Sequence, residues 1–229
     1  MYLLTSGHLR MPRRLEKLRA RSASDKELRR GAILEAARRQ LRRVASADLL
    51  VADVARAAGV AKGSVFRYFP TKEALVLAVF ELELTDLFSA LSAKLATHER
   101  LDSVTFVRAL VGELRQRPVY LHLATVVHGV LEHNIELDDC VRFKQHLLAH
   151  LTMAGALVER LLGFLRPGEG LRLLLRIHAL LIGLWQLTDH PPVVAEAVTT
   201  MGLDVFRIDF SDELEDVLVV LLRGMEARS

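Results

Sequence analysis

The sequence is poor in cysteine, proline and aromatic residues. Its 229 residues include a single cysteine, Cys140, which excludes an intrachain disulfide framework and a cysteine-rich zinc cluster. A hydrophobic fraction of 51% with only six prolines argues against a disordered chain, and no segment shows convincing strand alternation. We therefore predict an all-α protein in a reducing compartment, with the cytoplasm as its location.

Signals for export and for the membrane are also scarce. The first residues offer only a short apolar stretch before their charges, which is the wrong order for a secretory signal. The most apolar run, residues 171–187, contains Arg172, Arg176 and His178, which are costly in lipid. We predict a buried or interfacial helix there and no membrane partner.

Motifs for catalysis and for metal binding are missing from the sequence. It contains no G-x-S-x-G, no H-E-x-x-H and no glycine-rich phosphate loop, and Cys140 follows two acids that disfavour a reactive thiolate. His146 and His150 stand four residues apart on one predicted helix, but a zinc site needs a third ligand. We predict no enzyme activity, no cofactor and no metal.

Charge is distributed unevenly along the chain. Residues 1–72 contain 17 Lys and Arg against 6 Asp and Glu, a net charge of +11. Residues 73–229 contain 14 against 22, a net charge of −8. Because phosphate contacts come from Lys and Arg, the basic third indicates a polyanion partner. Taken by itself, the uneven charge favours the alternative that these basic residues form an ordinary solvated surface.

Apolar periodicity and helix breakers predict ten helices. The first has Ser24 or Asp25 as its cap and places Ile33, Leu34, Ala37 and Leu41 on one apolar face. Residues 1–23 are predicted to form a flexible basic arm, 24–71 a three-helix domain, and 72–229 a larger helical domain. The predicted helices cover residues 24–44, 50–58, 61–69, 72–98, 102–115, 118–133, 136–165, 171–188, 193–201 and 211–226.

The stretch "VADVARAAGVAKGSVFRYFP" (residues 51–70) has the pattern of a helix-turn-helix. Gly59 can close the first short helix in the left-handed conformation, and Val65 and Phe69 form a core-facing pair on the second. The outward residues would then contact DNA, with Arg67 suited to guanine and Gly63 leaving room for close approach. The predicted DNA-binding residues are Arg29, Lys62, Gly63, Ser64, Arg67, Tyr68 and Lys72.

These residues resemble the DNA-binding head of TetR-type transcriptional regulators. The resemblance rests on "ILEAA" (33–37) and on "VADVARAAGVAKGSVFRYFPTKEALV" (51–76). It implies an all-helical homodimer that binds a palindromic DNA operator and leaves it when a small molecule occupies the body. It also implies a phosphate contact for Lys72, at a helix start where backbone N–H groups attract anions.

Four residues depart from the family's usual pattern. Ala45 stands in place of a glycine, and Leu50 in place of a capping threonine, for which we expect Asp48 to substitute. Ala61 and Phe66 replace a capping serine and a phosphate-contacting tyrosine. Each missing neutral contact is worth about 1 kcal/mol, which the basic arm could offset in the minor groove. The arm could equally be an unstructured tail, with Met11 as the true start.

In the larger domain we predict a dimer surface and an effector pocket, which is bounded by the predicted helix 72–98 and the helices 102–115, 118–133 and 136–165. Each predicted pocket residue could also be plain core, and the scarcity of aromatics favours an aliphatic or amphipathic effector. The C-terminal helices would form a four-helix dimer interface, or else an intrachain core. The effector-binding candidates are Phe88, Phe106, His128, Phe143, His146 and Trp185. The dimer candidates are Leu180, Leu184, Val219 and Leu222.

The function predicted from sequence is a DNA-binding transcriptional regulator, a homodimeric repressor released from its operator by a small-molecule effector. The first alternative is a helical ligand-binding or scaffold protein whose head has lost specific operator recognition, given Leu50, Ala61 and Phe66. The second is a nonspecific nucleic-acid binder.

Overall fold

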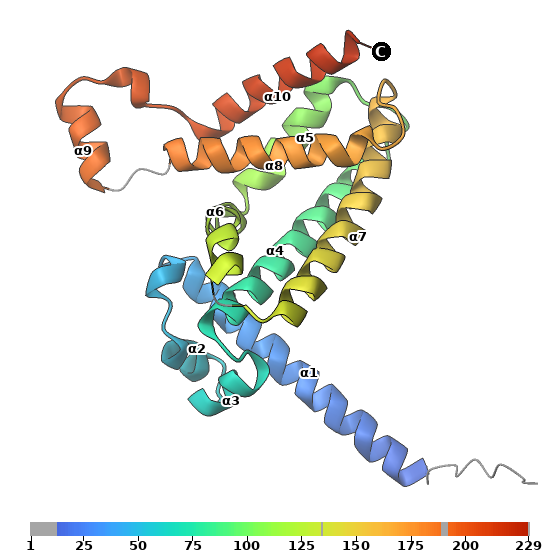
Figure 1. The fold of residues 1–229 in the computed structure, drawn as a ribbon, viewed down its shortest axis with the longest axis vertical. Helices are drawn as coiled ribbons and strands as arrows, with labels where there is room; N and C mark the ends of the chain where they lie inside the picture. Colours follow the sequence, from blue (N-terminus) through green and yellow to red (C-terminus); the bar gives the residue numbers. More distant parts are fainter. Residues whose placement is uncertain (1–12, 134, 189–191, 229) are drawn as a thin grey trace, which may run out of the picture.

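The computed structural model describes residues 13–133, 135–188 and 192–228, and in these residues the fold is all-α (Figure 1). We call α1 to α3 the head and α4 to α10 the body. Two short 3-10 helices, η1 and η2, complete the order. The elements are α1 Arg13–Leu41, η1 Ser46–Asp48, α2 Val51–Ala57, α3 Lys62–Tyr68, α4 Lys72–Leu95, α5 Ser103–Arg115, α6 Pro118–His133, α7 Leu137–Leu162, α8 Glu169–Thr188, α9 Pro192–Thr200, η2 Asp204–Phe206 and α10 Phe210–Glu226.

The first helix is longer than the sequence predicted. We expected it to begin at a cap at Ser24 or Asp25 and to end near Val44, but α1 runs unbroken from Arg13 to Leu41. The stretch RRLEKLRARSASDKELRR contains no glycine or proline, and its Arg, Leu, Glu and Lys residues favour helix, so Ser24 and Asp25 continue it. The predicted arm of 1–23 is thus helical from Arg13, and residues 1–12 lie outside the described chain.

The turn between α2 and α3 matches the prediction. Gly59 has φ +68°, its N–H donates to the Arg56 carbonyl, and the Val60 N–H donates to the Ala55 carbonyl. This pair of bonds satisfies the last carbonyls of α2 and requires the left-handed conformation that glycine adopts without strain. The turn therefore fixes the direction in which α3 leaves α2.

The core of the head comes from the residues expected for it. Ile33, Leu34, Ala37 and Leu41 on α1 are buried, as are Val54 on α2 and the pair Val65 and Phe69. The Arg30 guanidinium lies 5.2 Å from the centroid of the Phe69 ring. Since Val65 and Phe69 point inward, the remaining faces of α3 are left for contacts outside the chain.

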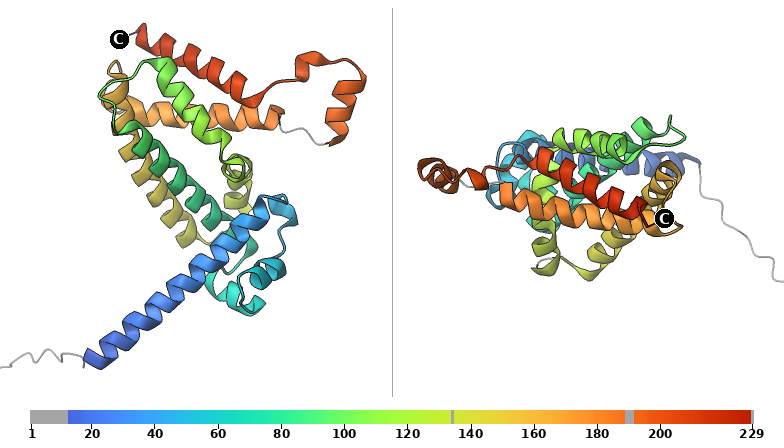
Figure 2. Two further views of the ribbon diagram at one scale, coloured as in Figure 1. Left: turned by 180° about the vertical axis from the view of Figure 1, so that it is seen from behind. Right: turned by 90° about the horizontal axis from the view of Figure 1, so that it is seen from above.

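The body stacks a layer of α8 and α10 on a group formed by α4, α5, α6 and α7 (Figures 1 and 2). α4 and α7 end at Leu95 and Leu162, earlier than the predicted 98 and 165. For α7 the reason is Gly163, whose φ of +47° closes the helix. α7 and α8 cross at Gly155 and Gly170, where backbone meets backbone: a β-carbon on Gly155 would lie 2.8 Å from the Leu171 nitrogen.

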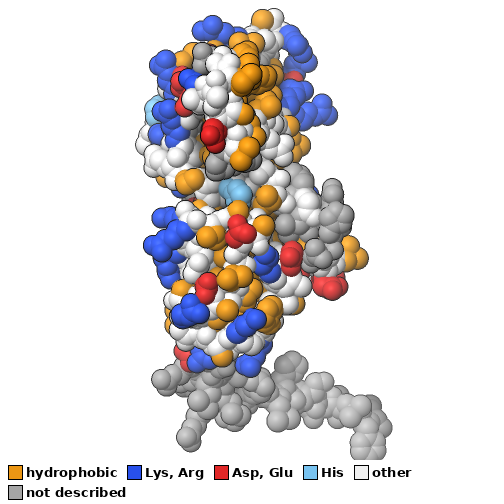
Figure 3. Space-filling view, turned by 90° about the vertical axis from the view of Figure 1, so that its left-hand side faces the viewer, with side chains coloured by type: hydrophobic (Ala, Val, Ile, Leu, Met, Phe, Trp, Pro, Cys, Tyr) orange, Lys and Arg blue, Asp and Glu red, His pale blue; other side chains and the backbone are white. Residues whose placement is uncertain are grey.

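α9 and η2 project beyond the ends of α8 and α10 (Figure 1). This projection exposes Val193, Met201 and Val205. Figure 3 views the molecule from this side, and hydrophobic side chains gather in the upper part of that face. By length and composition alone α8 could cross a membrane, but in the fold it packs against α6, α7 and α10.

Candidate nucleic-acid interface and ligand cavity

The outer face of α3 carries the residues predicted to contact DNA. Lys62, Gly63 and Arg67 are exposed, and Ser64 is half-buried. Tyr68 is also half-buried and packs against the core, so only part of its ring faces outward. Arg29 is exposed on α1. The structure thus brings a guanidinium, an ammonium and two hydroxyls onto one seven-residue helix.

Gly63 has no packing role inside the described chain. A β-carbon there would meet nothing within 4 Å, so the room that glycine leaves lies on the solvent side of α3. The starts of α2 and α3 lack side-chain caps, as Leu50 and Ala61 suggest. The expected substitute cap, Asp48, is wrong: it belongs to η1, before the N-cap position of α2. Phe66, in place of a hydroxyl-bearing residue, is exposed.

Two side-chain hydrogen bonds lie at the start of α4, and one of them reaches the head. Thr71 caps the helix as predicted, because its Oγ1 accepts the Ala74 N–H at 3.0 Å. The Lys72 Nζ donates to the Ala47 carbonyl at 2.7 Å, which ties α4 to the η1 turn. A phosphate contact for Lys72 stays a prediction, and this bond holds its ammonium at the junction of head and body.

A buried ion pair joins the head to the body. The Arg38 Nε of α1 donates to the Glu83 Oε1 of α4 at 2.5 Å, and its Nη2 lies 2.9 Å from Asp86. Glu83 is only 2% exposed. Burial opposes the charge of Arg38, but the carboxylates of Glu83, Asp86 and Glu35 outweigh it and raise the pKa of the guanidinium. Head and body are also joined by a hydrogen bond that the Ser46 N–H donates to His122 Nε2 on α6, at 3.3 Å.

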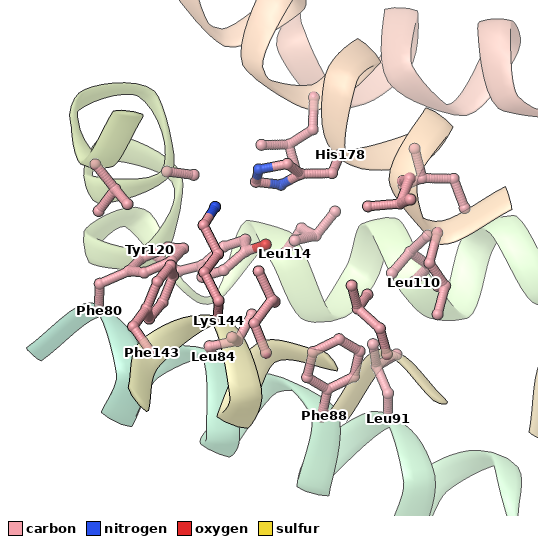
Figure 4. A pocket seen from close by; sticks show the side chains of 18 residues that line it. Phe80, Leu84, Phe88, Leu91, Leu110, Leu114, Tyr120, Phe143, Lys144 and His178 are labelled. Carbon is pink, nitrogen blue, oxygen red and sulfur yellow. The ribbon is translucent and has the colours of Figure 1, made fainter. Parts of the chain in front are cut away.

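A cavity of about 100 Å³ lies between α4, α5, α6, α7 and α8 (Figure 4). The sequence predicted a cavity beside α4 bounded by the next three helices; α8 adds a further wall. Phe88 and Phe143, both predicted effector residues, line it. The lining consists of Phe80, Leu84, Phe88, Leu91, Leu110, Leu114, Tyr120, Ala124, Val127, Phe143, Lys144, Leu147, Leu151, Leu174, Leu175, Ile177, His178 and Leu181.

Three other predicted effector residues, Phe106, His146 and Trp185, do not line this cavity. Phe106 is buried elsewhere in the core of the body. Trp185 makes an edge-to-face contact with Phe210, at 5.1 Å between centroids, and lines a separate groove where head and body meet. That groove also includes Leu41 to Ala45, Pro118, Val119 and His122. The side chain of His128 lies outside the described part of the structure.

His146 and His150 face different partners. The His146 Nδ1 lies 3.9 Å from Glu81. Burial raises the pKa of Glu81, and the opposing effect of His146 and other nearby charges is smaller. The His150 ring stacks on Phe88 at 5.5 Å between centroids, and its Nε2 lies 3.3 Å from the Thr85 hydroxyl. Within the described residues no three His, Cys, Asp or Glu side chains gather as a metal site would require.

Two titratable residues of the cavity lining, Lys144 and His178, were not among the predicted effector residues. Helical spacing would have found both, because Lys144 shares a face with Leu147 and Leu151, and His178 shares one with Leu174 and Leu181. From sequence, His178 served only as a reason against a membrane span. Polar residues inside an apolar stripe are the signal that marks a ligand site.

The predicted dimer residues fall into two groups. Leu180, Leu184 and Val219 are half-buried in the single chain. Leu222 is completely buried, within the packing of α10 against α5 and α8, so its assignment to a partner-facing surface is wrong. The helical face of α10 that points outward instead carries Val220, which is 72% exposed.

Two family profiles match the chain. The profile described as bacterial regulatory proteins, tetR family, matches residues 33–79. The profile described as the tetracyclin repressor-like C-terminal domain matches residues 81–229. Among curated proteins, the chain is 31% identical over 106 residues to the HTH-type transcriptional regulator BetI of Brucella suis biovar 1 (strain 1330). That match covers 44% of this chain and 54% of BetI, so the chain spans about half the length of this relative.

Solved structures have the same fold. The fatty acid degradation regulator FadR from Bacillus halodurans aligns with a TM-score of 0.54 and 19% identity, over 85% of this chain and 98% of that one. The TetR family transcriptional regulator PfmR from Thermus thermophilus aligns with a TM-score of 0.53 and 16% identity, over 83% and 97%. At these identities the likeness is one of fold.

Proposed function

Since this chain belongs to the TetR family of transcriptional regulators, we propose that it is a homodimeric repressor of a palindromic operator. A small molecule in the body cavity releases it from the DNA. In this proposal residues 24–71 bind DNA and residues 72–229 bind the effector and the partner subunit. The observation that carries the proposal is the outer face of α3, where Arg67 and Lys62 stand exposed beside Gly63.

The DNA contacts divide into two kinds. The planar fork of Arg67 suits guanine O6 and N7 in the major groove, whereas Lys62 and the Tyr68 hydroxyl suit phosphate oxygens. Lys72 stands at the N-terminus of α4, where a phosphate would also meet free backbone N–H groups. Two copies of α3 would read half-sites about 34 Å apart, one turn of DNA.

The test is selection of bound duplexes from a random-sequence library. We expect enrichment of a palindrome with half-sites one helical turn apart. Selection without any enriched sequence would contradict the proposal. It would favour a nonspecific nucleic-acid binder or a protein whose head has lost specific operator recognition. The starts of α2 and α3, which lack side-chain caps, are consistent with the latter.

Arg67→Ala is expected to weaken binding to the enriched palindrome by roughly 1–3 kcal/mol and to relax the preference at one base pair, because a bidentate base contact is lost. Lys72→Ala is the matched comparison: we expect uniform weakening on all sequences and a shallower dependence on salt. Fluorescence anisotropy across a salt series measures both. If Arg67→Ala weakens binding to all sequences equally, Arg67 contacts a phosphate instead of a base.

α4 connects the cavity to the head. Its 24 residues span about 36 Å, with Lys72 bonded to Ala47 at one end and Phe88 and Leu91 lining the cavity toward the other. Leu84 faces the cavity while its neighbour Glu83 holds Arg38 of α1. A ligand that displaces α4 at Leu84 would thus move the head through this ion pair. A 100-fold loss of operator affinity requires about 2.7 kcal/mol of preference for the DNA-free form.

We assign the dimer surface to the outer faces of α8 and α10. α8 exposes Ala179, Gly183 and Leu187, and α10 exposes Val220. Small residues allow two helices to approach closely, and two helices from each subunit form a four-helix interface around a two-fold axis. α9 and η2, which also expose apolar residues, project beyond the ends of α8 and α10 (Figure 1).

The double substitution of Leu187 and Val220 by Glu is expected to give monomers at micromolar concentration. Both side chains are exposed in the single chain, at 57% and 72%, so the subunit can still fold while charges enter an apolar seam. Leu137→Glu is the control, because Leu137 is also exposed but lies at the first residue of α7. Analytical ultracentrifugation measures the mass. A dimeric double variant would rule out this surface.

A further inference from the structure

The cavity has an apolar interior and one polar end. Of the 18 side chains that line it, none is a carboxylate. In Figure 4 the Lys144 ammonium and the His178 imidazole extend into the space between α7 and α8, above the leucine and phenylalanine side chains of α4. Because Lys144 is exposed and also lines the cavity, this end of the cavity meets solvent.

Lys144 differs from three basic residues of the body that form ion pairs. Arg142 pairs with Asp139, Lys94 with Glu113, and Arg108 with Glu215. Lys144 forms no ion pair within the described residues, and its ammonium lies 5.6 Å from the centroid of the Phe143 ring. A cation above an apolar cavity attracts an anionic group whose remainder is apolar, since charged hydrogen bonds are stronger than neutral ones.

The aromatic rings around the cavity are already engaged with one another. Phe80 stacks on Tyr120, with 5.6 Å between centroids and 12° between planes. Phe88 stacks on His150 at 5.5 Å and 5°. One face of Phe80, Tyr120 and Phe88 is therefore covered, which leaves fewer ring faces to hold a flat aromatic ligand. Leucine is the commonest residue of the lining, and its side chains suit a flexible aliphatic chain.

We propose that the cavity binds an amphipathic anion, a carboxylate on a single unbranched aliphatic chain. The carboxylate accepts hydrogen bonds from Lys144 Nζ and from the His178 ring at the solvent end, and the chain lies among Leu84, Leu110, Leu114 and Leu147. This assignment rests on the proposed function, since it names the ligand class of the effector cavity.

The experiment is isothermal titration of the full-length protein with three ligands of equal chain length: decanoate, decan-1-ol and decyltrimethylammonium. Decanoate is expected to bind about ten-fold tighter than the alcohol, because it gains a charged hydrogen bond, and the cation is expected to bind no better than the alcohol. Equal binding of acid and alcohol, or no binding of decanoate, would overturn the proposal.

Lys144→Met tests the charge while keeping an unbranched side chain of similar length. Its decanoate affinity should fall toward that of decan-1-ol, because only the His178 bond to the carboxylate remains, and its affinity for the alcohol should stay unchanged. The control is Lys94→Met, which removes a lysine of the body that pairs with Glu113 and lies outside the cavity lining; it should bind decanoate as the wild type does. Unchanged decanoate affinity in Lys144→Met would overturn the assignment of the carboxylate to this residue.

A separate readout distinguishes failure of this inference from failure of the proposed function. Release of the selected operator is followed by fluorescence anisotropy with the same ligands. If decanoate binds through Lys144 but leaves operator affinity unchanged, the ligand class stands and effector release fails. If the alcohol releases the operator as well as decanoate does, effector release stands and the anionic class fails.

Discussion

Replacement of Arg38 by Leu is expected to lower the free energy of unfolding by about 3–5 kcal/mol. The substitution leaves the Glu83 carboxylate in a site that is 2% exposed, without the guanidinium that lies 2.5 Å from it. A buried charge without its partner loses its hydration and gains nothing in return. Urea unfolding followed by circular dichroism, at equal protein concentrations, measures the loss.

The matched control is the double variant Arg38→Leu with Glu83→Leu. Replacing a whole buried ion pair by apolar residues is often neutral, so the double variant should recover most of the stability lost in the single one. Asp86, which also contacts Arg38, is 40% exposed and can be hydrated in both variants. A single variant as stable as the wild type would show that Glu83 reaches water and that the pair does not hold head and body together.

Gly170→Val is expected to destabilise the body by about 3 kcal/mol or more, in the upper range for overpacked sites. A β-carbon on Gly170 would collide with the Gly155 carbonyl oxygen and approach the Glu159 side chain to 2.9 Å. The obstacle is mainly backbone, so it cannot rotate away as a flexible side chain would. Separation of α7 from α8 would also stretch the bond from the Gly170 N–H to Glu159 Oε1, now 2.9 Å. Thermal unfolding measures the effect.

Gly31→Ala provides the control for Gly170→Val. Gly31 lies inside α1 and a β-carbon there would meet nothing within 4 Å. The gain in helix propensity, about 1 kcal/mol, should raise the melting temperature or leave it unchanged. If Gly170→Val has the melting temperature of the wild type, the crossing of α7 and α8 can accommodate a larger side chain, and the close backbone contact does not limit it.

The head could be predicted from sequence because its signals are local. Gly59 marks a turn that only a left-handed residue closes, and Val65 and Phe69 are four residues apart on a short helix, so their burial follows from spacing. The predicted start of α1 was wrong, also for a local reason. Ser24 and Asp25 are good N-caps, but they can continue a helix when the residues on both sides of them favour helix.

The cavity and the joints between head and body could be predicted only in part. Arg38 meets Glu83 across 45 residues of sequence, and the pair gives no periodic signal that would distinguish it from surface charge. Leu222 is apolar on an amphipathic helix, and spacing alone cannot separate a residue facing the chain's own core from one facing a partner. His146 points to Glu81 rather than to the cavity because α7 is rotated to bring Phe143 and Leu147 inward.

Trp185 gives the protein a built-in optical reporter. It is the sole tryptophan of the sequence, and the groove that it lines joins the last turn of α1 and the following residues to α6 and α8. Any motion that opens or closes that groove changes the surroundings of its indole, and with them the wavelength and intensity of its emission. Rearrangement of the head against the body can therefore be followed on the unlabelled wild-type protein, in real time and in either the presence or the absence of DNA.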